Sequence, residues 1–148
     1  MNTRTSAAIL LATLFGAAAS AHAHGPGTGD GEEKINILEQ RALPDAPGKT
    51  ALVFTVEYAP GQKSIPHVHG GSVVAYVLEG AVVSQLEGEQ PVTYSAGQSW
   101  YETPGIDHLV SRNASKTNPA KLLVWILNEG DGPVLTPLPS SADARPSR

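Results

Sequence analysis

The chain has 148 residues, of which 41% are hydrophobic and 16% are charged, and its formal net charge is −4. The length predicts one domain, the apolar content argues against a disordered chain, and the acidic balance argues against nucleic-acid binding, which needs clustered Lys and Arg. The chain has no cysteine, which excludes disulfides, Cys-ligated zinc, iron–sulfur clusters and Cys nucleophiles.

Residues 1–23 have the pattern of a secretory signal peptide. Arg4 supplies the positive start, an apolar run over residues 7–19 follows, and Ala21-His22-Ala23 forms an A-x-A cleavage site. Cleavage there starts the mature chain at His24. Because a membrane span needs about 20 apolar residues, we expect a protein exported to a bacterial periplasm, without stable membrane insertion after cleavage, rather than an uncleaved anchor.

A second cleavage site, Ala19-Ser20-Ala21, is equally acceptable and would leave His22-Ala23-His24 at the mature N-terminus. A terminal amine, deprotonated amides and a histidine at the third position suit a tetragonal copper or nickel ion. This gives a minor alternative metal site.

Residues 24–33 are Gly-rich and polar and predict a flexible N-terminal segment, and residues 137–148 predict a loose C-terminal tail. The domain is therefore expected over residues 34–136. Within it, short β-branched and apolar runs alternate with Gly and Pro turn signals, which predicts strands. These runs are 34–43, 51–58, 72–78, 81–86, 91–94, 98–102, 107–112 and 120–128. The pattern favours an all-β jelly-roll or a similar barrel.

Three histidines lie in this predicted domain. His67 and His69 are two residues apart, so on a strand they share one face, and His108 opens a later strand after a tight turn. A barrel could bring the three imidazoles together, and neutral imidazole is a ligand for zinc, copper, iron and nickel.

The chain resembles the cupins over residues 49–128. Gly61-x5-His67-x-His69 followed by Tyr76-Val77-Leu78-Glu79-Gly80 is similar to the first cupin motif, and Gly97 followed by Pro104-Gly105-x-x-His108 is similar to the second. The resemblance implies a single cupin jelly-roll β-barrel that holds a metal on His67, His69 and His108. Leftover histidines in a metal-free cupin are the alternative.

Two positions depart from the cupin pattern. The first motif usually carries a glutamate seven residues before its closing glycine, and here that residue is Val73, which cannot bind a metal. An Asn often follows the His of the second motif by four residues, and here that residue is Arg112. The remaining three-His set resembles the subset of cupins, including thiol and diketone dioxygenases, that hold iron without the carboxylate.

Glu102 precedes His108 by six residues, and some three-His cupins resemble the chain in having a glutamate there. It could be a fourth ligand, an acceptor for the N–H of a ligand histidine, a general base, or a solvated carboxylate. Arg112 shares strand parity with His108, so it could clamp a carboxylate substrate, although a solvent-facing Arg is an equal alternative. Trp100 could line the pocket or serve as a core aromatic.

A divalent transition metal would keep three closely packed imidazoles neutral, so we expect metal affinity to fall below about pH 6 to 6.5. The first hypothesis is a metal-dependent oxidoreductase of the dioxygenase type that acts on a small chelating or anionic substrate. Iron fits this reading best, and zinc, manganese, copper and nickel are alternatives. The competing hypotheses are a non-catalytic ligand-binding or metal-binding cupin and a metal-assisted isomerase or lyase. The strand over residues 34–43 could pair in a homodimer.

Overall fold

The computed structural model describes residues 32–130 and 132–139, and within these residues the elements are all strands. In this part of the chain no helix is long and apolar enough to cross a membrane. The predicted signal peptide, with His22 and His24, lies outside the described residues.

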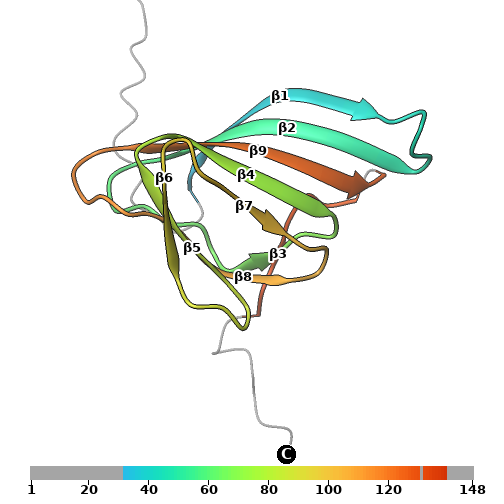
Figure 1. The fold of residues 1–148 in the computed structure, drawn as a ribbon. Coiled ribbons are helices and arrows are strands. Elements are labelled where there is room, and N and C mark those ends of the chain that lie inside the picture. The colour runs from blue at the N-terminus through green and yellow to red at the C-terminus, as the bar shows by residue number, and fades with distance from the viewer. Residues whose placement is uncertain (1–31, 131, 140–148) are drawn as a thin grey trace, which may run out of the picture.

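The strands of the described residues form two antiparallel sheets of five strands each, which face each other (Figure 1). The first sheet contains, in spatial order, β1 (Lys34–Ala42), β2 (Lys49–Tyr58), β9 (Ala120–Glu129), β4 (Ser72–Glu79) and β7 (Ser99–Glu102). The second contains β10 (Thr136–Pro137), β3 (His67–Val68), β8 (Asp107–Asn113), β5 (Ala81–Leu86) and β6 (Val92–Ser95). This architecture confirms the predicted all-β class and the jelly-roll arrangement.

The structure adds two short strands that the apolar pattern did not reveal. β3 carries His67, and β10 pairs with it in antiparallel register. Pro137, which fell in the predicted tail, belongs to β10, and the backbone N–H of Leu138 donates to the carbonyl of Pro66. Two-residue strands are too short to show alternation, so only their pairing with longer strands identifies them.

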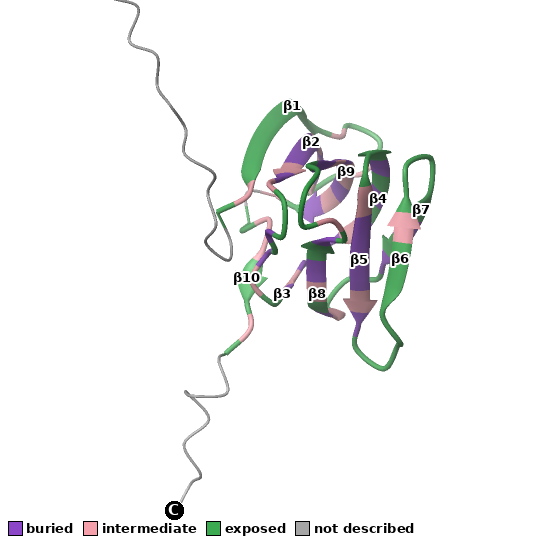
Figure 2. Ribbon diagram, turned by 90° about the vertical axis from the view of Figure 1, so that its left-hand side faces the viewer, coloured by how far each residue is buried: buried purple, intermediate pink, exposed green. Residues whose placement is uncertain are grey.

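The period-two pattern of the long strands places one face of each sheet in the core. In β9 the residues alternate between buried and half-buried up to Asn128, before the exposed Glu129, and β2 follows the same pattern at its start (Figure 2). Alternate side chains of a strand point to opposite faces, so the inward set packs between the sheets. The main buried apolar residues are Leu52, Phe54, Val56, Tyr58, Val73, Ala75, Val77, Val82, Trp100, Leu122, Val124 and Ile126.

Gly71 marks a close approach between the histidine segment and β9. A Cβ at this residue would collide with the backbone carbonyl of Leu127, whereas a Cβ at the preceding Gly70 would meet nothing within 4 Å. Only glycine therefore lets the chain pass from His69 into β4 this close to the backbone of β9. The contact fixes where His69 sits relative to the first sheet.

β1 is an edge strand, and all nine of its residues are exposed (Figure 2). Its exposed apolar side chains include Ile35, Ile37 and Leu38. The pairing of this strand with a second copy stays a prediction.

Candidate metal centre

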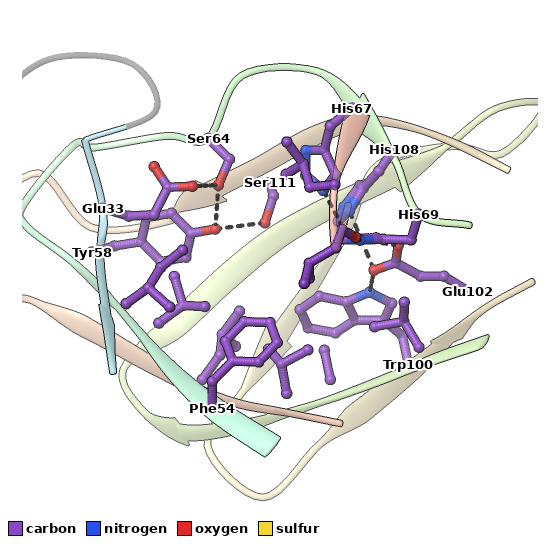
Figure 3. A pocket seen from close by; sticks show the side chains of 18 residues that line it. Glu33, Phe54, Tyr58, Ser64, His67, His69, Trp100, Glu102, His108 and Ser111 are labelled. Atoms are coloured by element: carbon purple, nitrogen blue, oxygen red, sulfur yellow. Dashed lines mark hydrogen bonds and ion pairs between the residues drawn. The ribbon is translucent and has the colours of Figure 1, made fainter. Parts of the chain in front are cut away.

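A cavity of about 200 Å³ lies between the two sheets and takes its lining from both. Its middle is walled by apolar side chains, and polar side chains gather at its two ends (Figure 3). The apolar wall residues include Phe54, Val56, Val73, Ala75, Leu122 and Val124. Its small volume suits a small ligand.

His67, His69, His108 and Glu102 line one end of this cavity, so the structure brings together all three histidines and the glutamate singled out from the sequence. His67 on β3 and His108 on β8 are directly paired across the second sheet. His69 follows β3, and Glu102 ends β7 in the first sheet. All four side chains are buried. The site therefore joins the two sheets.

The hydrogen bonds of His67 and His69 determine which ring nitrogen carries the proton. Nδ1 of His67 lies 2.7 Å from the carbonyl oxygen of Ile65, and Nδ1 of His69 lies 2.6 Å from the carbonyl oxygen of Val134. A carbonyl only accepts, so both Nδ1 atoms donate. In the neutral rings both Nε2 atoms then carry no proton and each presents a lone pair. The two Nε2 atoms lie 3.1 Å apart. Two lone pairs at this distance repel unless a cation or a proton lies beside them.

The pKa of His67 is lowered to about 4, mainly by burial and in smaller part by His69 and His108, against the opposing effects of the Ile65 carbonyl and Glu102. His67 is therefore neutral at pH 7. At His67, protons therefore compete with a metal only near pH 4, rather than near the reference value of 6.5. For the three-histidine site as a whole, the loss of metal affinity expected below about pH 6 to 6.5 stays a prediction. At neutral pH the facing lone pairs therefore fit a metal cation better than a proton on His67.

Glu102 supplies a third electron-rich atom. Trp100 Nε1 donates to its Oε1 over 2.9 Å, while Oε2 is buried without a hydrogen-bond partner among the described residues and lies 3.9 Å from Nε2 of His69. Burial raises the pKa of Glu102, but the contacts of its carboxylate with His108, Trp100 and His69 outweigh burial and hold the pKa below its usual value. Glu102 is thus a buried carboxylate with one open oxygen. Trp100 serves both expected roles, since it lines the cavity and packs in the core.

His108 is positioned differently from the other two histidines. Its Nε2 lies 2.9 Å from Oγ of Ser84, and its Nδ1 lies 3.2 Å from Oε1 of Glu102 without the alignment of a hydrogen bond. Accordingly, no group of three or more ligand-type side chains in the described part of the chain is arranged to hold a metal ion. The donor chemistry fits a divalent metal, with two imidazoles already aligned. His108 would have to exchange its contact with Ser84 for the ion.

Arg112 does not reach the cavity, which corrects the parity argument. The pairing of β5 with β8 shifts its register between the pairs Gln85–Val110 and Leu86–His108, leaving an extra residue in β8. Such a bulge reverses the inward parity. Beyond the bulge, Ser111 is buried and Arg112 is exposed. The guanidinium of Arg112 donates a hydrogen bond to the backbone carbonyl of Asn113. Arg112 is therefore no substrate clamp at this site.

The opposite end of the cavity contains residues that the sequence patterns did not single out. Tyr58, Ser64 and Ser111 form a hydrogen-bonded cluster with Glu33, a residue from the segment predicted to be flexible. Tyr58 and Ser111 lie at inward strand positions that look ordinary in the sequence, and Glu33 and Ser64 lie outside the strands. No motif or spacing signal could have found them, because the cluster joins β2, β8 and two loop segments.

Comparison with known proteins supports the fold. Residues 54–126 match the family model described as the cupin domain. No curated protein sequence matches the chain. Among solved structures, the chain is similar to the DMSP lyase DddQ from Ruegeria pomeroyi DSS-3, with 18% identity and a TM-score of 0.59 over 76% of this chain and 54% of that one.

Two further structures are similar. An uncharacterized conserved protein with a double-stranded β-helix domain from Klebsiella pneumoniae subsp. pneumoniae MGH 78578 shares 18% identity, with a TM-score of 0.57 over 76% of this chain and 89% of that one. Recombinant oxalate oxidase in complex with glycolate shares 21% identity, with a TM-score of 0.56 over 73% of this chain and 56% of that one. The chain thus spans about half the length of the lyase and oxidase chains. At these identities the likeness concerns the fold.

Proposed function

Since the chain belongs to the cupin superfamily, we propose that it is a metal-dependent oxidoreductase of the dioxygenase type that acts on a small anionic or chelating substrate. His67, His69 and His108 would hold a divalent transition metal, with iron as the ion that fits this chemistry best. Glu102 would act beside it as the base. Arg112 has no part in this proposal, because it is exposed.

One observation carries the proposal. The imidazoles of His67 and His69 each donate through Nδ1 to a backbone carbonyl and face each other through Nε2 at 3.1 Å. Backbone carbonyls that hold the tautomer and orientation of histidine rings are the usual support of metal ligands. Glu102 adds a negative charge at the same place, and its Oε2 has no hydrogen-bond partner within the described residues. Together these groups form an electron-rich pocket that a cation would neutralise.

A bound iron would supply Lewis acidity and the capacity to react with dioxygen. The protein's own contribution begins with Glu102, whose lowered pKa keeps it ionised at neutral pH, so Oε2 can accept a proton from an acidic substrate. Trp100 holds the other oxygen through Nε1 and so orients the carboxylate. The apolar walls exclude water and strengthen these interactions.

Glu102 also favours a second candidate, a metal-assisted lyase or isomerase, because a buried carboxylate with an open oxygen can remove a proton from carbon. This activity would not consume oxygen. A non-catalytic cupin that binds a metal or small ligand would show neither reaction.

The test is oxygen uptake by iron-loaded protein with diketones, small thiols and phenolic acids as substrates. We expect uptake that depends on iron and is lost in His67→Ala, whereas Arg112→Ala, the control at an exposed position, keeps it. Absence of uptake with every substrate class refutes the dioxygenase reading. Substrate loss without oxygen would favour the lyase or isomerase. Elemental analysis without stoichiometric metal would count against every metal-enzyme candidate.

We further propose that residues 1–23 direct export to the periplasm and are then removed. The support is the sequence pattern alone, with Arg4, the apolar run and the A-x-A site. N-terminal sequencing of protein recovered from a periplasmic fraction should begin at His24 or at His22. An intact Met1 would contradict the proposal.

A further inference from the structure

The second polar end of the cavity is a connected cluster of four side chains (Figure 3). Oη of Tyr58 lies 2.7 Å from Oγ of Ser64 and 2.9 Å from Oγ of Ser111. Ser64 in turn donates to Oε1 of Glu33 over 2.6 Å. Figure 3 shows this cluster across the cavity from Glu102 and Trp100, with Ser111 on the side towards the histidines.

The number of hydroxyl protons in this cluster determines which group donates in each hydrogen bond. Ser64 uses its only hydroxyl proton on Glu33, so the short contact between Ser64 and Tyr58 needs the proton of Tyr58. The contact between Tyr58 and Ser111 then needs the proton of Ser111. All three hydroxyl protons therefore point along the chain towards Glu33. Burial raises the pKa of Tyr58 to about 12, so the phenol keeps its proton at neutral pH.

Within the part of the chain that the structure describes, Oε2 of Glu33 has no donor. It is buried and has no hydrogen-bond partner in the described residues, although Glu33 lines the cavity. Every hydroxyl proton within the cluster is already used, so the cluster itself cannot supply the missing one. A buried carboxylate oxygen that lacks a donor is costly, and a charge-assisted bond from a ligand would remove that cost.

We propose that Glu33, with the Tyr58–Ser64–Ser111 chain behind it, forms a second subsite that binds an ammonium group at the far end of the substrate. The subsite selects small molecules with an anionic head, a short apolar body and a terminal amine. The head faces the histidine end, the body contacts the apolar wall, and the amine donates to Oε2 of Glu33. The head assignment rests on the proposed function, whereas the amine assignment rests on the cluster alone.

Paired probes test the subsite without any turnover. Short-chain ω-amino acids and the unsubstituted carboxylic acids of equal chain length are titrated calorimetrically into the zinc-loaded and the chelator-treated protein. For at least one chain length we expect the amino-ended probe to bind about tenfold or more tightly than its methyl-ended partner, as for a hydrogen bond to a charged group. Equal affinity of the two partners at every chain length overturns the proposal.

Glu33→Gln sharpens the test because the variant keeps the shape of the side chain. Its amide oxygen can still accept from Ser64, while its NH2 group replaces the open acceptor with a donor. We expect the preference for amino-ended probes to disappear and probes that end in a methyl ester to gain affinity. Glu87→Gln, an exposed position with the same change of charge, should keep the wild-type preference. If Glu87→Gln loses the preference for amino-ended probes equally, the preference arises from the net charge of the protein, and the subsite is refuted.

The two proposals fail in different ways. If the zinc-loaded and chelator-treated proteins bind both probes alike while the preference for amines persists, the metal-binding head of the proposed function fails and the amine subsite stands. If zinc raises the affinity of both probes equally and the amino-ended probe has no advantage, the subsite fails and the proposed metal centre stands.

Discussion

Val73 on β4 and Glu102 on β7 lie directly opposite each other in antiparallel register, and both are buried with 1% and 2% of their surface exposed. Cross-strand partners have Cβ atoms about 5 Å apart. The cupin motif that the chain resembles usually has a glutamate where Val73 stands. The carboxylate absent from that position is therefore present on the neighbouring strand, beside His69 and His108.

The pairing predicts that metal affinity depends on a carboxylate at this place in the site, whichever of the two strands carries it. Glu102→Val should weaken metal affinity by about 10- to 100-fold, the usual cost of losing a partner of metal ligands. The double variant Val73→Glu, Glu102→Val returns the carboxylate across the strand pair and should recover most of the affinity. Competition with a fluorescent chelator measures both. If the metal affinity of Glu102→Val stays at the wild-type value, the carboxylate does not contribute to metal binding.

Ser84 and His108 give a matched pair of variants that test His108 as the third proposed metal ligand. His108→Ala should abolish stoichiometric metal binding. Ser84→Ala only removes the hydroxyl that contacts Nε2 of His108, so it should bind metal at least as tightly as the wild type. Elemental analysis and chelator competition provide the readout. Retention of full affinity by His108→Ala would leave His67, His69 and Glu102 as the binding set.

The stability of the chelator-treated protein should fall on acidification. The pKa of His67 is about 4 in the folded protein and 6.5 in the reference state, so the unfolded chain binds the extra proton between these values and stability declines from about pH 6.5 to about pH 4. The lowered pKa of Glu102 acts in the same direction, since its contribution is present above its reference value of 4.5 and is lost below it.

Urea midpoints measured across this pH range check the prediction. His67→Gln removes the titrating ring and should flatten the decline above about pH 4.5, where Glu102 does not yet contribute. A wild-type midpoint that stays constant from about pH 6.5 to about pH 5 would contradict the burial of a neutral His67.

Gly71 and Gly70 provide a stability test beside the candidate metal centre. Gly71→Ala places a methyl group against the carbonyl of Leu127, so it should lower the free energy of unfolding by about 2 kcal/mol or more through overpacking. Gly70→Ala meets no neighbour and should change it by less than about 0.5 kcal/mol. Chemical denaturation measures both. Equal effects of the two substitutions would mean that the close approach is not what selects glycine.

Much of the fold was predictable because the long strands carry their own signal. Alternating or continuous apolar runs bounded by Gly and Pro identified β2, β4, β5 and β9 nearly to their ends. The short β3 and β10 were missed, since two residues carry no periodicity. The bulge in β8 was missed as well, and with it the outward direction of Arg112, because strand parity in sequence assumes regular pairing.

The sequence by itself determined the class of the fold and the identity of the histidines and the glutamate at the site, because spacing and turn residues are local properties of the chain. Only the tertiary structure decided which atoms face each other. The tautomers of His67 and His69 depend on carbonyls at Ile65 and Val134. The proximity of Glu102 to the histidines depends on strand register, and the Glu33 cluster depends on packing of distant segments. These relationships arise from long-range pairing, which no short stretch of sequence encodes.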